Sequence, residues 1–254
     1  MTSLVEAVLD IIHPTPVFIV GSAVAAEEAG LPNAFDDIDI FCPSAESLMV
    51  AATRLQLEGY TPQDPRVLLR WQRYGIGNFH TNSLKLDAPN MPVVNLVYKK
   101  QGGHPLRSLT QVIESFDFGL LAQGYNAADK RYLDLRGSYF PDLDTDGPLP
   151  LMPSKQADWA HGFIGKYDSM RQFGRYVKYH AYGYDMSAVK PDLLDCYTSL
   201  ADYHRSKPTD EAAAAVTIYS MIASHIEHDE FDMLAKASAS LEYSSTFEQI
   251  LESL

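Results

Sequence analysis

Short apolar stretches, separated by turn residues, run through the first 136 residues and predict a sheet interleaved with helices. A strand carries its apolar side chains in continuous or alternating order, and turns are rich in Gly, Pro, Asn and Asp. The segments that fit a strand are 16–20, 37–42, 67–75, 81–87, 92–100, 116–126 and 131–137.

Four other segments of this half have apolar residues at the spacing of a helix. Residues 1–14 form an amphipathic pattern, and the Ala-rich segment 22–30 ends at Gly30, a common helix stop. Ser44 and Ser108 stand at the start of the other two, where a serine side chain caps the first free backbone amides. These two helices are expected over 44–59 and 108–115.

The second half of the chain has a different pattern. Residues 138–153 hold four prolines and three aspartates with little periodicity, which predicts a connection between domains. From 154 onward the spacing is helical, with a long helix over 155–181, others from about 190 and 210, and shorter ones at the end. We therefore expect an α+β fold, with a mixed sheet and flanking helices in 1–137 and an α-helical domain in 154–254.

Two carboxylates, Asp37 and Asp39, interrupt an otherwise buried strand. Successive side chains of a strand point to opposite faces, so the two acids share one face while Ile38 and Ile40 take the other. Two neighbouring carboxylates repel each other unless a cation lies between them. Mg²⁺, which prefers carboxylates, waters and phosphates as ligands, is the expected cation, with Mn²⁺ as a substitute.

Gly21 and Ser22 lie just upstream, where the first strand passes into a helix. Free backbone amides at such a turn favour an anion, and the absence of a side chain on Gly21 lets a phosphate approach closely. A phosphate site followed by a metal-binding strand is the arrangement expected for a nucleoside triphosphate.

These residues give the chain a resemblance to a known family. "VGS", fourteen further residues and then "DIDIF" resemble the signature of the polymerase-β-like nucleotidyltransferase superfamily. "FDF" at 116–118 and "RYVKYHAYGYD" at 175–185 are similar to nucleotidyltransferase-like proteins of phages and large viruses. The resemblance implies a mixed sheet, a helical second domain and two-metal transfer of a nucleotidyl group.

The chain departs from the superfamily pattern at the third carboxylate. In the best local match, "PVVNLVY", Asn95 stands where an acid is expected, and an amide supplies neither a base nor a charge for a second metal. Asp117 in "FDFGLL" and Asp87 at the end of "SLKLD" are the two possible replacements. We favour Asp117, and expect the catalytic carboxylates to be Asp37, Asp39 and Asp117.

Two segments of the chain are basic although its net charge is −13. In the segment 155–190, Arg175, Lys178 and Tyr179 recur at helical spacing on one face, so we expect them to bind the triphosphate together with Gly21 and Ser22. The rival source of positive charge is the segment 66–107, in which these cations could reach the acids from neighbouring strands: Arg70, Lys85 and Lys99. The alternative for both segments is an ordinary solvated face.

The cysteine content and the hydropathy of the chain bear on its cellular compartment. Two lone cysteines, Cys42 and Cys196, fit a reducing compartment, and no stretch has the roughly 20 apolar residues of a membrane span. We expect a cytoplasmic protein, in the host cytoplasm if the chain is viral, with no membrane partner. His225, His228 and Asp229 share a helix face, which we interpret as solvated.

The expected function is Mg²⁺-dependent transfer of a nucleoside monophosphate from an NTP to an acceptor hydroxyl. The sequence does not identify the acceptor, and an RNA end, a protein side chain and a small molecule are all open. The acidic balance disfavours a long nucleic acid. The alternative, favoured by Asn95, is a catalytically degenerate member of the superfamily that binds a nucleotide or a protein partner.

Overall fold

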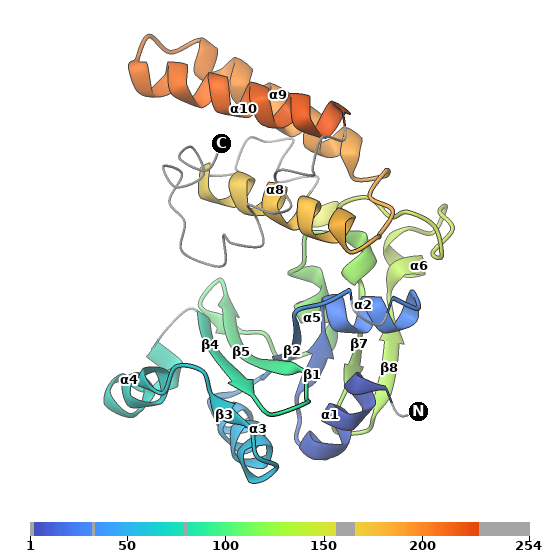
Figure 1. The fold of residues 1–254 in the computed structure, drawn as a ribbon, viewed down its shortest axis with the longest axis vertical. Coiled ribbons are helices and arrows are strands. Elements are labelled where there is room, and N and C mark those ends of the chain that lie inside the picture. The colour runs from blue at the N-terminus through green and yellow to red at the C-terminus, as the bar shows by residue number, and fades with distance from the viewer. Residues whose placement is uncertain (1–2, 32–33, 79–80, 156–165, 229–254) are drawn as a thin grey trace. The chain divides into compact units, whose positions relative to one another are not determined.

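The computed structural model describes residues 3–31, 34–78, 81–155 and 166–228 (Figure 1). The chain divides into two compact units. The first comprises Met1–Phe116 and Leu120–Ser138, and the second comprises Asp117–Gly119 and Tyr139–Leu254. Each unit is described by itself.

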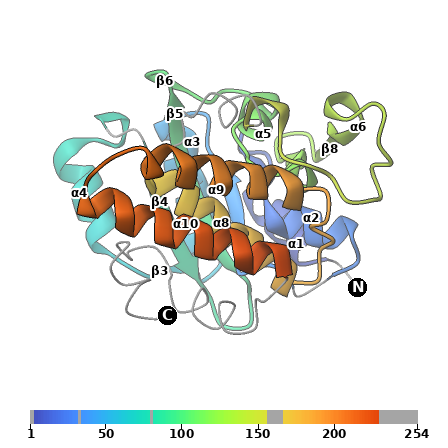
Figure 2. The ribbon, with the colours of Figure 1, turned by 90° about the horizontal axis from the view of Figure 1, so that it is seen from above.

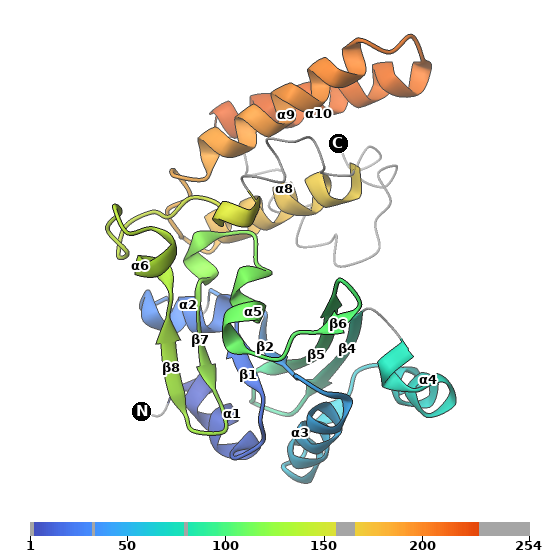
Figure 3. The same ribbon diagram turned by 180° about the vertical axis from the view of Figure 1, so that it is seen from behind.

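The first unit is built on a mixed sheet, which confirms the expected α+β class. Its strand order is β3-β4-β5-β2-β1-β7-β8, and β6 pairs with β5 (Figure 3). Among the described pairings, β2 and β5 run parallel and the others antiparallel. The strands are β1 (Phe18–Val20), β2 (Asp37–Phe41), β3 (Thr61–Pro62), β4 (Thr81–Asp87), β5 (Val93–Gln101), β6 (His104–Pro105), β7 (Gln123–Asn126) and β8 (Arg131–Asp134).

One face of the central strands carries the hydrophobic core. Alternate residues of β2, β4 and β5 on this face are fully buried. Helices α1 (Leu4–Ile12), α2 (Ser22–Glu28) and α3 (Ala45–Leu57) supply the apolar side chains of the same core cluster. The strand residues are Ile38, Ile40, Leu84, Leu86, Val94 and Leu96.

The expected serine caps are confirmed at two helices. Ser44 accepts a hydrogen bond from the backbone amide of Ser47 at the start of α3, and Ser108 accepts one from Gln111 at the start of α5 (Leu109–Glu114). Each cap satisfies an amide that has no partner inside the helix. The first helix has the same device at Ser3.

The strand predicted over 67–75 is wrong, because this segment is the helix α4 (Arg66–Tyr74), followed by the short 3₁₀ helix η1 (Ile76–Asn78). Trp71 is its buried residue, and its indole Nε1 donates to Asn82 at 2.8 Å. The arginines fall on the other side at helical spacing. The run "VLL" by itself resembles a strand. Trp71, however, stands four residues after Val67, which is the spacing of a helix.

The strand predicted over 116–126 is also too long. Residues Gly119–Leu121 form a 3₁₀ helix, η2, and β7 begins only at Gln123. A Cβ on Gly119 would come within 2.7 Å of the Pro150 carbonyl oxygen, so a distant part of the chain packs on this turn. Asp117 therefore lies before the turn and not inside a strand.

From Lys166 onward the described part of the second unit is mostly helical, as expected. Helices α9 (Lys190–Arg205) and α10 (Asp210–His228) lie side by side (Figure 2), and α8 (Lys166–Ala181) contacts α9 through Phe173 and Tyr197. The ring centroids of Tyr197 and Tyr219 are 6.2 Å apart, which joins α9 to α10. The short α6 (Arg136–Tyr139) stands at the boundary of the units. The predicted helical residues 156–165 and those after 228 lie outside the described residues.

Within the described residues, no helix combines the length and the apolar composition that a membrane span requires.

Candidate functional site

A polar face lies on the side of the central strands opposite the core. Asp39 of β2 pairs with Asn95 of β5, and Asn95 pairs with Lys85 of β4. Residues paired in this way point to the same face, and so do residues two apart on one strand. The sheet register therefore places Asp37, Asp39, Asn95, Lys85 and Ser83 on one face.

Asp39 lies directly against Gly21. A Cβ built on Gly21 would stand 2.9 Å from Oδ2 of Asp39, closer than real Cβ contacts allow. The backbone of Gly21 has φ 85° and ψ −157°, a conformation that only glycine adopts readily. The absence of a side chain thus brings a carboxylate and the turn after β1 together.

Ser22 follows this turn as the first residue of α2 and is 5% exposed. The predicted phosphate-binding pair therefore heads a seven-residue helix beside Asp39. The structure brings together three of the predicted site residues: Gly21, Ser22 and Asp39.

Asn95 acts as a hydrogen-bond bridge on this face. Its Nδ2 donates to Oδ1 of Asp39 at 2.8 Å, and its Oδ1 accepts from the Ser83 hydroxyl at 2.5 Å. A carboxylate only accepts, so the amide nitrogen has to face Asp39. An aspartate here would place a third negative charge against Asp39, whereas the asparagine stabilises the charge already present.

Asp37 has a different partner. Nζ of Lys85 lies 3.1 Å from its Oδ2, and the two side chains are 25% and 10% exposed. This ion pair satisfies part of the charge that two neighbouring acids would otherwise leave uncompensated. The structure thus supplies a protein cation at the position where the sequence predicts a metal.

The two carboxylates fit a magnesium ion that arrives with a nucleotide. Mg²⁺ is commonly held by one or two carboxylates together with substrate phosphates and waters. Asp37 and Asp39 share a face, and the Asp39 carboxylate lies against the backbone of Gly21. Over the described ranges, no group of three His, Cys, Asp or Glu side chains could hold a metal by itself.

Asp117, the predicted third carboxylate, belongs to the second unit and forms a buried ion pair there. Its side chain is 7% exposed and binds the guanidinium of Arg175, with Lys155 Nζ 3.9 Å from its other oxygen. The structure thus joins two predicted residues, an acid and a phosphate-binding cation, to each other. Their catalytic and nucleotide-binding roles stay predictions.

Lys178 and Tyr179 face aromatic neighbours in the second unit. Lys178 Nζ lies 5.5 Å from the ring centroid of Tyr182, a cation–π distance. Tyr179 is 7% exposed and makes edge contacts with Phe118 and Tyr184. Tyr179 is therefore part of an aromatic core, and its predicted contact with a nucleotide stays a prediction.

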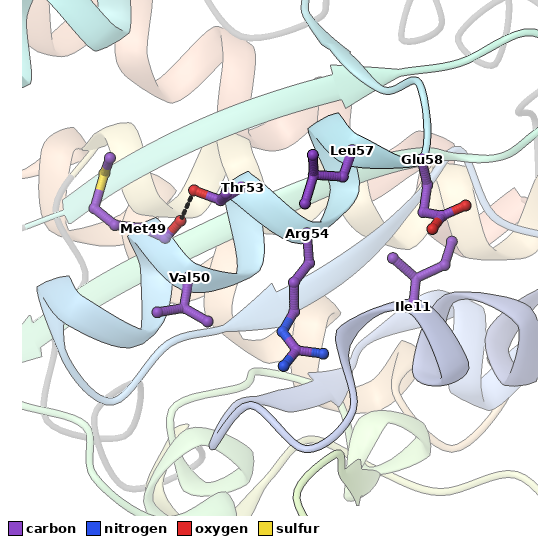
Figure 4. Close-up of a pocket in the computed structure, with 7 residues that line it drawn as sticks. All are labelled: Ile11, Met49, Val50, Thr53, Arg54, Leu57 and Glu58. Carbon is purple, nitrogen blue, oxygen red and sulfur yellow. Dashed lines mark hydrogen bonds between the residues drawn. The ribbon is translucent and has the colours of Figure 1, made fainter.

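A hollow on α3 is separate from these carboxylates. Figure 4 shows it between α3 and α1, with exposed apolar side chains such as Leu57 and the guanidinium of Arg54 at its wall. Arg54 donates to the backbone carbonyl of His13. Asp37, Asp39 and Gly21 do not line this hollow, so it offers no support for the nucleotide site.

Within the part of the chain that the structure describes, the two cysteines and His228 form no further site. Cys42 and Cys196 are free and buried, and burial raises the pKa of Cys196 to about 12 and that of Cys42 further. Neither thiol is ionised near neutral pH, which excludes a ready nucleophile. His228 Nδ1 bonds the Ser224 carbonyl, and Asp229 lies outside the described residues.

Lys85 and Ser83 are the site residues whose roles the sequence does not reveal. Lys85 appears in the sequence only as one of three rival cations, and its contact with Asp37 crosses two strand pairings. The alternation in "TNSLKLD" is the available signal, since it puts Ser83 and Lys85 on the face opposite Leu84 and Leu86.

No protein-family model matches this chain, and a search of curated proteins finds no match either.

Proposed function

We propose that this chain is a nucleotidyltransferase-type protein that binds a magnesium nucleoside triphosphate and transfers its nucleotidyl group to an acceptor hydroxyl. The contact of Asp39 with the side-chain-free turn at Gly21 carries the proposal. It unites a carboxylate suited to a metal with a backbone turn suited to a phosphate. The motif resemblance of "VGS" and "DIDIF" adds to this support.

In the proposed reaction, the turn at Gly21 and Ser22 binds the β- and γ-phosphates, and Asp37 with Asp39 holds the metal. When bound, Mg²⁺ supplies charge neutralisation and Lewis acidity at the phosphates. The acceptor oxygen attacks the α-phosphorus, the bond to the β-phosphate oxygen breaks, and pyrophosphate leaves. The residues contribute mainly by positioning and by charge, as in phosphoryl transfer generally.

The hydroxyl proton needs an acceptor, and Asn95 is unsuitable because an amide is not a base. Asp117, the predicted third carboxylate, is held by Arg175 in the structure. Its participation as a base would require this ion pair to open. In the proposed reaction the hydroxyl proton therefore passes to solvent water.

A second candidate is nucleotide binding without transfer. Asn95 and Lys85 favour it, because the first replaces an expected acid and the second already neutralises Asp37. In this case the same face would bind the nucleotide without chemistry. Both candidates share the binding site and differ only in turnover.

The discriminating experiment uses each of the four NTPs labelled at the α-phosphate, with Mg²⁺ or Mn²⁺. Pools of RNA, protein and small hydroxyl compounds serve as acceptors, and Asp39→Asn is the control. Label that moves to an acceptor with the wild type but not with the control supports transfer. Metal-dependent binding without any labelled product supports the second candidate, and neither binding nor transfer would refute both.

A further inference from the structure

The ion pair of Lys85 with Asp37 takes no part in the proposed transfer reaction. We propose that Lys85 is a displaceable counter-ion, which holds Asp37 when the site is metal-free and moves to a nucleotide phosphate when Mg²⁺ binds. This inference rests on the proposed function. It assigns to Lys85 a positioning role that links metal binding to nucleotide binding.

The burial of the pair explains why Asp37 needs a cation beside it. The Asp37 side chain is 10% exposed, and Asp39 projects from the same face two residues away. Removing a carboxylate from water is costly unless a cation or donors replace the water. The Asn95 amide donates a hydrogen bond to Asp39, and the Lys85 ammonium places a full positive charge beside Asp37.

Lys85 and a metal compete for the same carboxylate. Lys85 Nζ stands 3.1 Å from Oδ2 of Asp37, while Mg²⁺ binds carboxylate oxygens at about 2.0–2.1 Å. Two cations at one carboxylate would repel each other strongly at this distance. A metal bound at Asp37 therefore displaces the ammonium group, which the flexible stem of lysine permits.

The displaced ammonium determines which ligand has to arrive with the metal. Without a nucleotide, Mg²⁺ has to break the ion pair with Asp37, so the metal alone binds weakly. With a triphosphate present, the phosphate oxygens accept the ammonium and offset this cost. Metal and nucleotide consequently raise each other's affinity, and the coupling is reciprocal.

The test is calorimetric titration of Mn²⁺ into the nucleotide-free protein, with Lys85→Met compared with the wild type. We expect the variant to bind Mn²⁺ at least tenfold more tightly, because the competing charge is gone. Lys130→Met is the matched control, since it removes the exposed ion pair with Asp10 in the same unit. This control should bind Mn²⁺ like the wild type.

A second titration, of Mn²⁺ in the presence of ATP, measures the coupling. ATP should increase the Mn²⁺ affinity of the wild type by a larger factor than that of Lys85→Met. If Lys85→Met fails to fold, Lys85→Gln retains a neutral donor beside Asp37 and is compared in the same way. Equal Mn²⁺ affinities of the wild type and the folded variant, within twofold, would overturn the proposal.

These outcomes separate the inference from the proposed function. If the wild type binds ATP with Mg²⁺ but Lys85 variants bind Mn²⁺ no more tightly, the nucleotide site stands and the counter-ion role fails. If the variants gain Mn²⁺ affinity but no form of the protein binds any NTP, the counter-ion role at the acid pair stands for the metal alone. Its extension to the phosphate then fails together with the proposed function.

Discussion

Oδ2 of Asp39 lies 2.9 Å from the point where a Cβ of residue 21 would stand, so Gly21 and Asp39 fit together only because Gly21 has no side chain. Val20, just before Gly21, pairs with Asp39 across β1 and β2. The sheet register thus fixes the distance between the turn and the carboxylate. A site built in this way depends on a backbone position as much as on an acid.

Substitution of Gly21 by Ala should damage both the fold and the site. The ε-region backbone of Gly21 costs a non-glycine residue about 1–3 kcal/mol, and the added methyl group would also displace the Asp39 carboxylate. Gly30→Ala is the control, because Gly30 also has a positive φ but no atom lies within 4 Å of its Cβ position. Urea unfolding and ATP titration should show a larger loss for Gly21→Ala, and equal losses would contradict the fit.

Substitution of Asp37 by Asn should lower stability as well as metal binding. From the sequence alone, removing one of two repelling acids should leave the stability unchanged or raise it slightly. The ion pair reverses this expectation, because the Lys85 ammonium then loses its carboxylate partner. We expect a loss of about 1–3 kcal/mol, between the values for exposed and buried pairs.

Urea unfolding measures this loss, with Asp10→Asn as the control for an exposed lysine–aspartate pair. The control should change the free energy of unfolding by less than about 1 kcal/mol. An Asp37→Asn protein as stable as the wild type would show that the ion pair contributes nothing to the fold.

Substitution of Asn95 by Asp restores an acid at the position where the superfamily resemblance expects one. The new carboxylate would face Asp39 at the place of a 2.8 Å hydrogen bond, so we expect a lower melting temperature without metal and a large recovery with Mn²⁺. Asn126→Asp is the control, because Asn126 Oδ1 accepts from the Ala128 amide and an aspartate can do the same. Thermal unfolding with and without Mn²⁺ checks this, and a variant indifferent to the metal would count against a metal site.

The pair of Arg175 and Asp117 calls for a double-mutant cycle. Either Arg175→Gln or Asp117→Asn alone leaves a partly buried charge without its partner and should cost about 2–4 kcal/mol, whereas the double variant should cost less than their sum. The double variant, once folded, is then titrated with ATP. A severalfold loss of affinity would support Arg175 as a phosphate-binding residue, and unchanged affinity would limit the pair to a structural role.

The fold follows from the sequence where the pattern is local. Acidic and apolar residues alternate in "DIDIF", which forms β2. Ser44 is the N-cap of α3, which begins at the next residue. The pattern fails where a distant contact decides the structure. Gly119 turns against Pro150, so the 3₁₀ turn η2 is not visible from neighbouring residues. The helix α4 is a different case, because Val67 and Trp71 stand at helical spacing and the adjacent "VLL" masks this signal.

The candidate site is predictable to the same extent. The common face of Asp37 and Asp39 follows from their spacing, and the Gly-Ser turn follows from its place after a strand. The partners of the two acids cannot be predicted in this way. Asn95 and Lys85 come next to them through the pairings of β2 with β5 and of β5 with β4, whose register the sequence leaves open. The contact of Asp117 with Arg175 is hidden because the two residues lie 58 positions apart in the sequence.

The central claim is that Asp37, Asp39 and the Gly21 turn bind a magnesium nucleotide, and metal-dependent ATP binding tests it most directly. Calorimetric titrations compare the wild type with Asp39→Asn, each with Mg²⁺ and with EDTA. Asn is nearly isosteric and still accepts the hydrogen bond from Asn95, so the fold should persist. We predict binding by the wild type with Mg²⁺, little with EDTA, and at least a tenfold weaker affinity for the variant. Equal affinity of the two proteins, or no binding of any of the four NTPs by the wild type, would contradict the account.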